Sequence, residues 1–295
     1  MSTGKMHADE ININTSLVRR LLASQFPQWA KLPITPVRSA GSDNALYRLG
    51  KELAVRLPRI GWAAGQMEKE HDWLPKLAPH LPLAIPAPLA QGVPGEGYPW
   101  RWSIYRWLAG VDLFARPLSD QRQLARDLAR FIAALRRIDT TGAPPADRGV
   151  PLAQRDADTR AAIAALRGML DTEAATAAWE AALRAPEWDG PPTWLHGDLL
   201  PTNLLVRGRR LSAVIDFGGL GVGDPACDLM PAWSILAGES RQIFRAALAV
   251  DNAMWARGRG WALSVALIAL PYYRTTNPIL ASISRRSIDA VLAER

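Results

Sequence analysis

One short stretch of the chain carries a histidine, two carboxylates and an amide at a spacing that could do chemistry. Asp198 comes two residues after His196, Asn203 follows five residues later, and Asp216 lies thirteen residues beyond Asn203. Moving a phosphoryl group requires divalent metal on the phosphates and a carboxylate that orients the attacking hydroxyl. Mg²⁺ takes hard oxygen ligands, typically one or two from the protein. We therefore predict that Asn203 and Asp216 bind Mg²⁺ and that Asp198 receives the substrate proton.

A β-hairpin is the element that must position these side chains. Two apolar runs, residues 204–206 and 211–215, are separated by Arg-Gly-Arg-Arg, and apolar–turn–apolar is the pattern of a hairpin. Asn203 directly precedes the first run, and Asp216 follows the second. A hairpin therefore brings both side chains, together with Asp198, to one end of a sheet.

The same residues carry a resemblance to a known family. His196-x-Asp-x-x-x-x-Asn followed by Asp-Phe-Gly is the catalytic-loop and metal-loop pattern of kinases, with Gly197 in place of the usual arginine. Together with Gly-Asp-Pro-Ala-Cys-Asp-Leu at 223–229, the stretch 194–229 resembles the aminoglycoside phosphotransferase family of the protein-kinase-like superfold. A weaker match in order and spacing runs from about residue 37 to 110, and the last sixty or so residues match only as a helical tail.

The predicted fold is α+β with two lobes. Strands dominate residues 37–107 and helices dominate 115–295 apart from the hairpin, a segregation typical of α+β proteins. The resemblance implies a protein-kinase-like fold, with a β-rich, nucleotide-binding N-terminal lobe at 1–107 and a mostly helical C-terminal lobe at 108–295. It also implies transfer of the ATP γ-phosphoryl group to a hydroxyl of a small molecule, with an aminoglycoside or similar antibiotic as acceptor, as in antibiotic resistance.

The nucleotide-binding residues are expected on the first strands. Residues 41–44 read as a turn between two strands, and its backbone N–H groups could hold an anion, which makes Ser42 and Asn44 candidate nucleotide contacts. The next strand places Ala54 and Arg56 on one face. By resemblance Ala54 lies over the purine and Arg56 takes the place of the phosphate-binding lysine, keeping the charge in a bulkier fork.

A helix after this strand should supply a carboxylate for Arg56. Glu70 stands where a kinase has the glutamate that orients the phosphate-binding cation, and Glu68 is the alternative because helix phase is uncertain from sequence. A further strand is expected at residues 101–107. The resemblance makes its end a hinge between the lobes, where backbone groups near Arg106 and Leu108 would hydrogen-bond adenine.

Three further polar residues of the central stretch are predicted to support structure rather than chemistry. His196 is expected to hold the catalytic loop by hydrogen bonds. Asp224 precedes Pro225 and suits a helix N-cap with proline in the first turn. The same structural reading is favoured for Asp228, since capping is the commoner task of such an aspartate.

Composition narrows the class of protein further. The single cysteine, Cys227, excludes an intrachain disulfide framework and fits a reducing cytosol, and no apolar segment at the N-terminus indicates a signal peptide. The net charge of +7 comes without a dense basic block, so we expect no nucleic-acid partner. The apolar run from Trp261 to Tyr273 is too short to span a bilayer, which argues for a core helix and against a membrane partner. A cytoplasmic location is therefore expected.

Charge counts after Leu229 argue against a polycationic acceptor, which needs carboxylates around it. Four acidic residues stand there against eight arginines: Glu239, Asp251, Asp289 and Glu294 against Arg241, Arg245, Arg257, Arg259, Arg274, Arg285, Arg286 and Arg295. Five aromatic residues in the segment suit a more apolar molecule: Trp233, Trp255, Trp261, Tyr272 and Tyr273. An acidic wall could still come from Asp156, Asp158, Asp171 and Glu173. We predict an acceptor with fewer positive charges than an aminoglycoside.

Rival hypotheses share parts of the pattern. A metabolic kinase for choline, homoserine or a sugar-like acceptor would carry the same motifs. A protein kinase is disfavoured, because neither Ala-Pro-Glu nor a long activation segment follows Asp216. An inactive nucleotide-binding module is the non-enzyme alternative, and the presence of Asp198, Asn203 and Asp216 argues against it.

Overall fold

The computed structural model describes residues 10–37, 41 and 43–294. Its strands are β1 (Ile34–Pro36), β2 (Asn44–Leu49), β3 (Leu53–Pro58), β4 (Pro88–Gly92), β5 (Trp102–Arg106), β6 (Val111–Asp112), β7 (Thr193–Leu195), β8 (Leu204–Arg207), β9 (Arg210–Val214) and β10 (Gly221–Gly223). Its α-helices are α1 (Thr15–Gln25), α2 (Gln66–Leu77), α3 (Gln121–Arg136), α4 (Asp156–Ala165), α5 (Thr172–Leu183), α6 (Pro231–Ser234), α7 (Gly238–Ala247), α8 (Asn252–Tyr273) and α9 (Pro278–Leu292).

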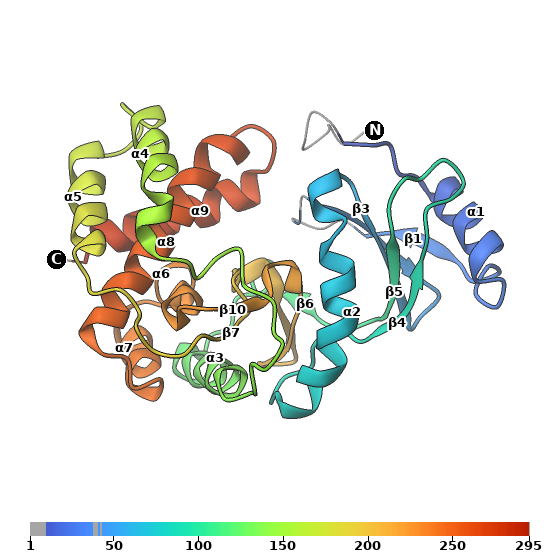
Figure 1. Ribbon diagram of the computed structural model, residues 1–295, viewed down its shortest axis with the longest axis horizontal. Coiled ribbons are helices and arrows are strands. Elements are labelled where there is room, and N and C mark those ends of the chain that lie inside the picture. Colours follow the sequence, from blue (N-terminus) through green and yellow to red (C-terminus); the bar gives the residue numbers. More distant parts are fainter. Residues whose placement is uncertain (1–9, 38–40, 42, 295) are drawn as a thin grey trace.

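A five-stranded antiparallel sheet forms the first lobe (Figure 1). Its spatial order is β1-β2-β3-β5-β4, so β3 lies at the centre between β2 and β5. The alternation of β3 divides its side chains between two faces. Val55 and Leu57 pack with α1 in one core, and Ala54 belongs to the core that continues into the second lobe.

Helix α2 lies between the sheet and the helical lobe (Figure 1). Its apolar side chains Met67, Leu74 and Leu77 are fully buried in the core shared with the second lobe. Glu70 falls on the same buried face, with a side chain that is 0% exposed. A buried carboxylate requires a partner, and the partner comes from β3.

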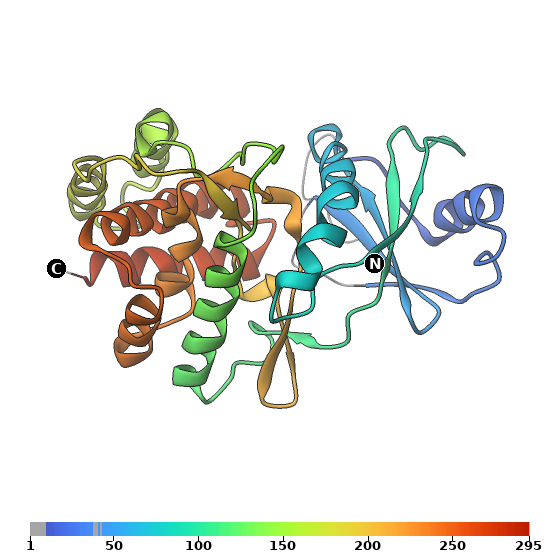
Figure 2. The ribbon, with the colours of Figure 1, turned by 60° about the horizontal axis from the view of Figure 1, so that its bottom comes forward.

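Helices α8 and α9 lie side by side at the centre of the second lobe (Figures 1 and 2). The sequence predicts a core helix at Trp261–Tyr273, and α8 confirms it, because half of its residues are buried from Trp255 to Leu270. Within the described part of the chain, no helix has the length and apolarity needed to cross a membrane.

The predicted catalytic hairpin is present as β8 and β9, which pair antiparallel from Leu204↔Val214 to Arg207↔Arg210. It projects as the orange-yellow hairpin at the bottom of Figure 2. Strand β6 extends it to three strands, and β7 pairs separately with β10. The loop from 196 to 203 therefore runs between two small sheets, which fix both of its ends.

Candidate active site

One cleft collects the three side chains with which the sequence argument began. Asp198, Asn203 and Asp216 all line it. Backbone hydrogen bonds set their spacing, because Asn203 donates to Leu200 O (2.9 Å) and accepts from Ile215 N (2.9 Å). The second bond ties the residue before β8 to the residue before Asp216, so the metal candidates are held next to one another.

Asp198 is held by two donors and remains accessible. Asn203 Nδ2 donates to Asp198 Oδ2 (2.9 Å) and also to its backbone carbonyl (2.9 Å). Arg148 Nη1 bonds to Asp198 Oδ1 and to Gly197 O. The Asp198 side chain stays 25% exposed. An accessible carboxylate in a fixed orientation can accept a proton from a hydroxyl placed in the cleft.

His196 supports the loop, as predicted, and does not face the cleft. Its Nδ1 accepts from the backbone N–H of Asp198 (3.1 Å), so Nε2 carries the proton that it donates to Ile215 O (3.1 Å). The ring packs edge-on against Phe217, with centroids 4.5 Å apart. These contacts connect the catalytic loop to the segment that carries Asp216.

Asp228 holds the backbone of the same loop. Its two carboxylate oxygens accept from the N–H groups of His196 and Gly197, each at 2.8 Å. Burial raises the pKa of the Asp228 carboxyl, and the two N–H donors lower it in part. The side chain is 0% exposed and cannot reach a substrate, so the structural role predicted for it is confirmed.

Gly197 stands at the position where kinases usually carry arginine. The backbone here leaves no room for a side chain. Its φ is +77°, and a Cβ there would lie 3.0 Å from Gly219 O. Only glycine adopts this backbone conformation at so close an approach without strain.

Arg56 links the two lobes at the cleft. Its guanidinium contacts Glu70 Oε1 (2.5 Å) and Asp216 Oδ1 (2.8 Å), which confirms the predicted pairing with Glu70. Glu68, the alternative, instead pairs with Arg101 at the surface. Burial alone would lower the pKa of Arg56, but attraction to Glu70 and Asp216 raises it above its ordinary value.

A second donor fixes the carboxylate of Glu70. The Tyr105 hydroxyl donates to Glu70 Oε2 (2.5 Å), so both oxygens of this buried group are satisfied. Burial, and next the neighbouring charge of Glu70, raise the pKa of Tyr105 well above its usual value. Tyr105 therefore remains a neutral donor to Glu70.

Asp216 adopts a left-handed backbone conformation, with φ +65° and ψ +68°. Such conformations cost energy in non-glycine residues and cluster at functional sites. Burial raises the pKa of the Asp216 carboxyl; Arg56 lowers it, and the charges of Asp198, Glu70 and Asp43 raise it further. Excess negative charge gathered here is what a bound cation would offset.

The other residues expected to contact the nucleotide have three different outcomes in the structure. With its amide oxygen turned toward β3, Asn44 accepts from Arg56 Nε (3.2 Å) and Nη2 (2.9 Å). Ser42 lies outside the described residues. Ala54, Arg106 and Leu108 are not among the described residues that line the cleft around Asp198, and their adenine contacts stay predictions.

The wall of the cleft formed by α8 and α9 is apolar. Helices α8 and α9 contribute Ala262, Val265, Ala266, Ala269, Tyr273, Leu280 and Ile283, with the hydroxyls of Ser284 and Ser287. The charged residues counted above lie elsewhere, since within the described chain none of them lines this cleft. The expectation that the three tryptophans serve the acceptor is wrong: they are buried, and Trp233 and Trp255 hydrogen-bond Glu294.

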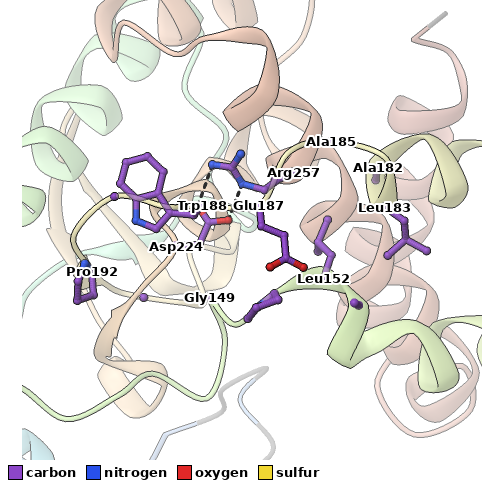
Figure 3. A pocket seen from close by; sticks show the side chains of 14 residues that line it. Gly149, Leu152, Ala182, Leu183, Ala185, Glu187, Trp188, Pro192, Asp224 and Arg257 are labelled. Carbon is purple, nitrogen blue, oxygen red and sulfur yellow. Dashed lines mark hydrogen bonds and ion pairs between the residues drawn. The ribbon is translucent and has the colours of Figure 1, made fainter.

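Asp224 has the capping role that the sequence predicts and a partner that it does not. Its Oδ1 accepts from Ala226 N (2.9 Å), and Arg257 of α8 contacts its Oδ2 at 2.7 Å (Figure 3). Both members of this ion pair are less than 8% exposed. They line a separate small pocket with Trp188 and Leu152, which shares no residue with the cleft of Asp198.

Arg148 is the site residue that the sequence argument missed. It lies in a proline- and glycine-rich loop about fifty residues before Asp198, with no motif around it. Only the fold brings this loop against the catalytic one.

Comparison with known proteins agrees with this geometry. The sequence matches the phosphotransferase enzyme family over residues 34–261, and the chain belongs to that family. No curated protein matches the sequence. The chain is thus a phosphotransferase, and it has the two-lobed, kinase-like fold of the solved members.

Solved structures extend the comparison over nearly the whole chain. A GDP complex of wild-type aminoglycoside 2'-phosphotransferase-IIIa has a TM-score of 0.75 at 18% identity, covering 95% of this chain and 99% of that one. The streptomycin–ATP–APH(2")-IIa ternary complex scores 0.59 at 19%, covering 88% and 91%. The apoenzyme of macrolide 2'-phosphotransferase MphH from Brachybacterium faecium scores 0.61 at 22%, covering 94% and 97%. At these identities the likeness establishes the fold.

Proposed function

We propose that the protein transfers the γ-phosphoryl group of ATP to a hydroxyl group of a small antibiotic-like molecule. The observation that carries this proposal is the assembly of Asp198, Asn203 and Asp216 on one cleft, with the Arg56–Glu70 ion pair joined to it through Asp216. An inactive binding module would have no need to keep an accessible carboxylate oriented by two donors.

Each residue then has a defined task. Asp198 accepts the proton of the acceptor hydroxyl, and Arg56, held by Glu70, binds the nucleotide phosphates. Ser42 and Asn44 contact the phosphates from the segment that leads into β2, Ala54 covers the purine, and backbone groups near Arg106 and Leu108 bind adenine. Residues 1–107 form the nucleotide-binding lobe and 108–295 the catalytic and acceptor lobe.

Asn203 and Asp216 fit a Mg²⁺ site completed by phosphate oxygens. Asn203 uses only its Nδ2 toward Asp198, which leaves Oδ1 available as a ligand. The described residues contain no cluster of three or more His, Cys, Asp or Glu that could hold a metal alone. One carboxylate and one amide are what Mg²⁺ takes from a protein when phosphates supply the rest. When bound there, Mg²⁺ offsets the charge of the phosphates.

The wall of the cleft favours a weakly charged acceptor. The neighbouring structures include enzymes named for aminoglycosides and for macrolides. A polycation needs carboxylates to replace its hydration, whereas the α8–α9 wall offers apolar surface and hydroxyls. A hydroxylated antibiotic of low charge therefore suits this wall better than an aminoglycoside. The alternative acceptors, which are choline-, homoserine- or sugar-like metabolites, are included in the assay described below. We further propose a cytoplasmic location, where ATP is abundant.

A nucleotide-turnover assay tests the proposal. Purified protein is supplied with ATP and Mg²⁺ and a panel of aminoglycosides, macrolides and hydroxylated metabolites, and phosphorylated products are identified by mass spectrometry. The expected result is a Mg²⁺-dependent mass increase of one phosphoryl group on at least one compound. Nucleotide binding without any turnover across the panel would favour the inactive binding module.

A further inference from the structure

The loop that carries Arg148 is fixed against the catalytic loop. Gly149 has φ +86°, and a Cβ there would lie 2.3 Å from Leu195 Cδ1, so this position accepts only glycine. Its carbonyl accepts from Asp224 N (2.8 Å), and Asp224 is itself held by Arg257 (Figure 3). The backbone on one side of Arg148 is therefore anchored to β7 and to the turn after β10.

The guanidinium of Arg148 has hydrogen-bonding capacity to spare. Nη1 donates to Gly197 O (2.8 Å) and contacts Asp198 Oδ1. Across the described chain, neither Nη2 nor Nε of this side chain has a hydrogen-bond partner, and 32% of the side chain is exposed. An arginine presents five N–H donors in a planar fork, so several remain available to an anion in the cleft.

The cleft has little other positive charge. Arg148 is the one basic residue among those described along its lining, which also includes Asp43, Asp147, Asp198 and Asp216. The catalytic loop from 196 to 203 contains neither lysine nor arginine. Among the described residues of the C-terminal lobe, a phosphoryl group that arrives beside Asp198 therefore finds a cation in the cleft lining only at Arg148.

We infer that Arg148 is a catalytic cation that binds the oxygens of the phosphoryl group during its transfer, a role that rests on the proposed function. In this step the acceptor oxygen forms a bond to the γ-phosphorus, and its proton passes to Asp198. The bond between that phosphorus and the bridging oxygen of ADP breaks, and its electron pair leaves with ADP. Negative charge spreads over the three equatorial oxygens.

Geometry favours this role over one limited to orienting Asp198. The acceptor oxygen must lie within hydrogen-bond reach of the Asp198 carboxylate, and the phosphorus lies one bond beyond it. Arg148 shares that carboxylate, so its free donors lie on the same side as the equatorial oxygens. Asn203 already orients Asp198 through Oδ2 and the backbone carbonyl, which leaves orientation adequately supplied without Arg148.

Binding of a transition-state mimic tests the inference without knowledge of the acceptor. ADP with Mg²⁺ is titrated calorimetrically into the protein with and without aluminium fluoride, whose planar anion imitates the phosphoryl group in transfer. We expect aluminium fluoride to tighten ADP binding by the wild type. Arg148→Ala should bind ADP within about threefold of wild type and lose about 10²–10³-fold of the tightening, typical of one lost oxyanion donor. Arg148→Lys should keep part of it.

The control is Arg160→Ala, which removes an exposed arginine of α4 that pairs only with surface carboxylates. It should leave both affinities unchanged. Arg148→Ala is also made in an Asp198→Asn background, where a residue acting only through Asp198 would have no further effect. Tightening that survives Arg148→Ala, or a loss that disappears in that background, would overturn the inference and leave the proposed function intact. A wild type that binds no ADP would overturn both.

Discussion

Arg56 of β3 donates a 2.8 Å hydrogen bond to Asp216, which lies 160 residues later in the chain. The same guanidinium holds Glu70 of α2, so one side chain connects the sheet, the helix beside it and the end of the catalytic hairpin. In our proposal a bound nucleotide and its metal meet Arg56 and Asp216 at this point. The ion pair therefore marks where the two lobes have to cooperate.

Two substitutions of Arg56 should separate the effect of its positive charge from the effect of its guanidinium shape. Arg56→Lys keeps a cation near Glu70 and should retain appreciable activity. Arg56→Ala leaves the fully buried Glu70 without its ion-pair partner, a change that typically costs about 3–5 kcal/mol of stability, and it removes the proposed phosphate contact. We expect a higher KM for ATP or a lower kcat, measured by steady-state kinetics below the unfolding temperature.

The matched control for Arg56 is Arg20→Ala on α1 of the same lobe, where the side chain is exposed and pairs with Glu96 at the surface. It should leave the kinetics unchanged. If folded Arg56→Ala and wild type had equal kinetic constants, Arg56 would be a structural charge without a role in phosphate binding.

Asp216→Ala should abolish transfer and weaken Mg²⁺-dependent nucleotide binding. The substitution removes the carboxylate of the proposed metal pair and leaves Asn203 as a single protein ligand. Turnover and nucleotide affinity are measured across a Mg²⁺ titration, with the exposed Asp189→Ala as control. An unchanged Mg²⁺ dependence in Asp216→Ala would show that the metal binds elsewhere.

Asp198→Asn should reduce kcat by about 10²–10⁴, the usual effect of losing a general base. The amide is nearly the same size as the carboxylate, but its single oxygen can accept from only one of Asn203 Nδ2 and Arg148 Nη1, so some stability is lost while nucleotide affinity should stay near wild type. Rapid-quench measurement of the transfer step would isolate the effect on chemistry. Near wild-type turnover by this variant would refute the assignment of Asp198 as the base.

Asp228→Asn should cost stability rather than nucleotide affinity. An amide has one oxygen for the two buried N–H groups of His196 and Gly197, and a buried donor left without a partner costs about 1–3 kcal/mol. Urea unfolding should show this loss, and the N-cap variant Asp171→Asn should not, because Asn caps a helix as well as Asp. Equal unfolding midpoints for Asp228→Asn and wild type would contradict the scaffold role.

The parts predictable from sequence are those whose partners lie close in the chain or share a periodic pattern. The hairpin at β8 and β9 follows from apolar runs and a turn, and it brings Asn203 beside Asp216 by its own geometry. The choice of Glu70 over Glu68 required the phase of α2, which the packing of Met67 and Leu74 sets. Sequence offered both carboxylates, and burial selected one.

Residues whose role depends on distant packing could not be predicted. Arg148 meets Asp198 because a loop with no motif is pinned by Gly149 and Asp224. The charges after Leu229 can be counted from the sequence, but which of them reach the cleft depends on how α8 and α9 pack. Within the described chain none of these charged residues lines the cleft, and Trp233, Trp255 and Trp261 are buried in the core. The predicted preference for a weakly charged acceptor now depends on the apolar wall instead.

The preference for a weakly charged acceptor can be tested by adding a negative charge to the apolar α8–α9 wall. We expect kcat/KM to be higher for weakly charged hydroxylated compounds, such as macrolides, than for kanamycin-like polyamines. Ala269 lines the cleft from α8 and is partly exposed, so Ala269→Asp would add a carboxylate there and should shift the ratio of kcat/KM values toward polyamines by about tenfold or more, as one favourable charge contact of about 1.4 kcal/mol would do. Ala256→Asp, on the same helix but outside the cleft lining, should leave the ratio unchanged. A wild type that prefers the polyamines would sink the argument from the wall, because the carboxylates elsewhere along the cleft would then outweigh the apolar surface of α8 and α9.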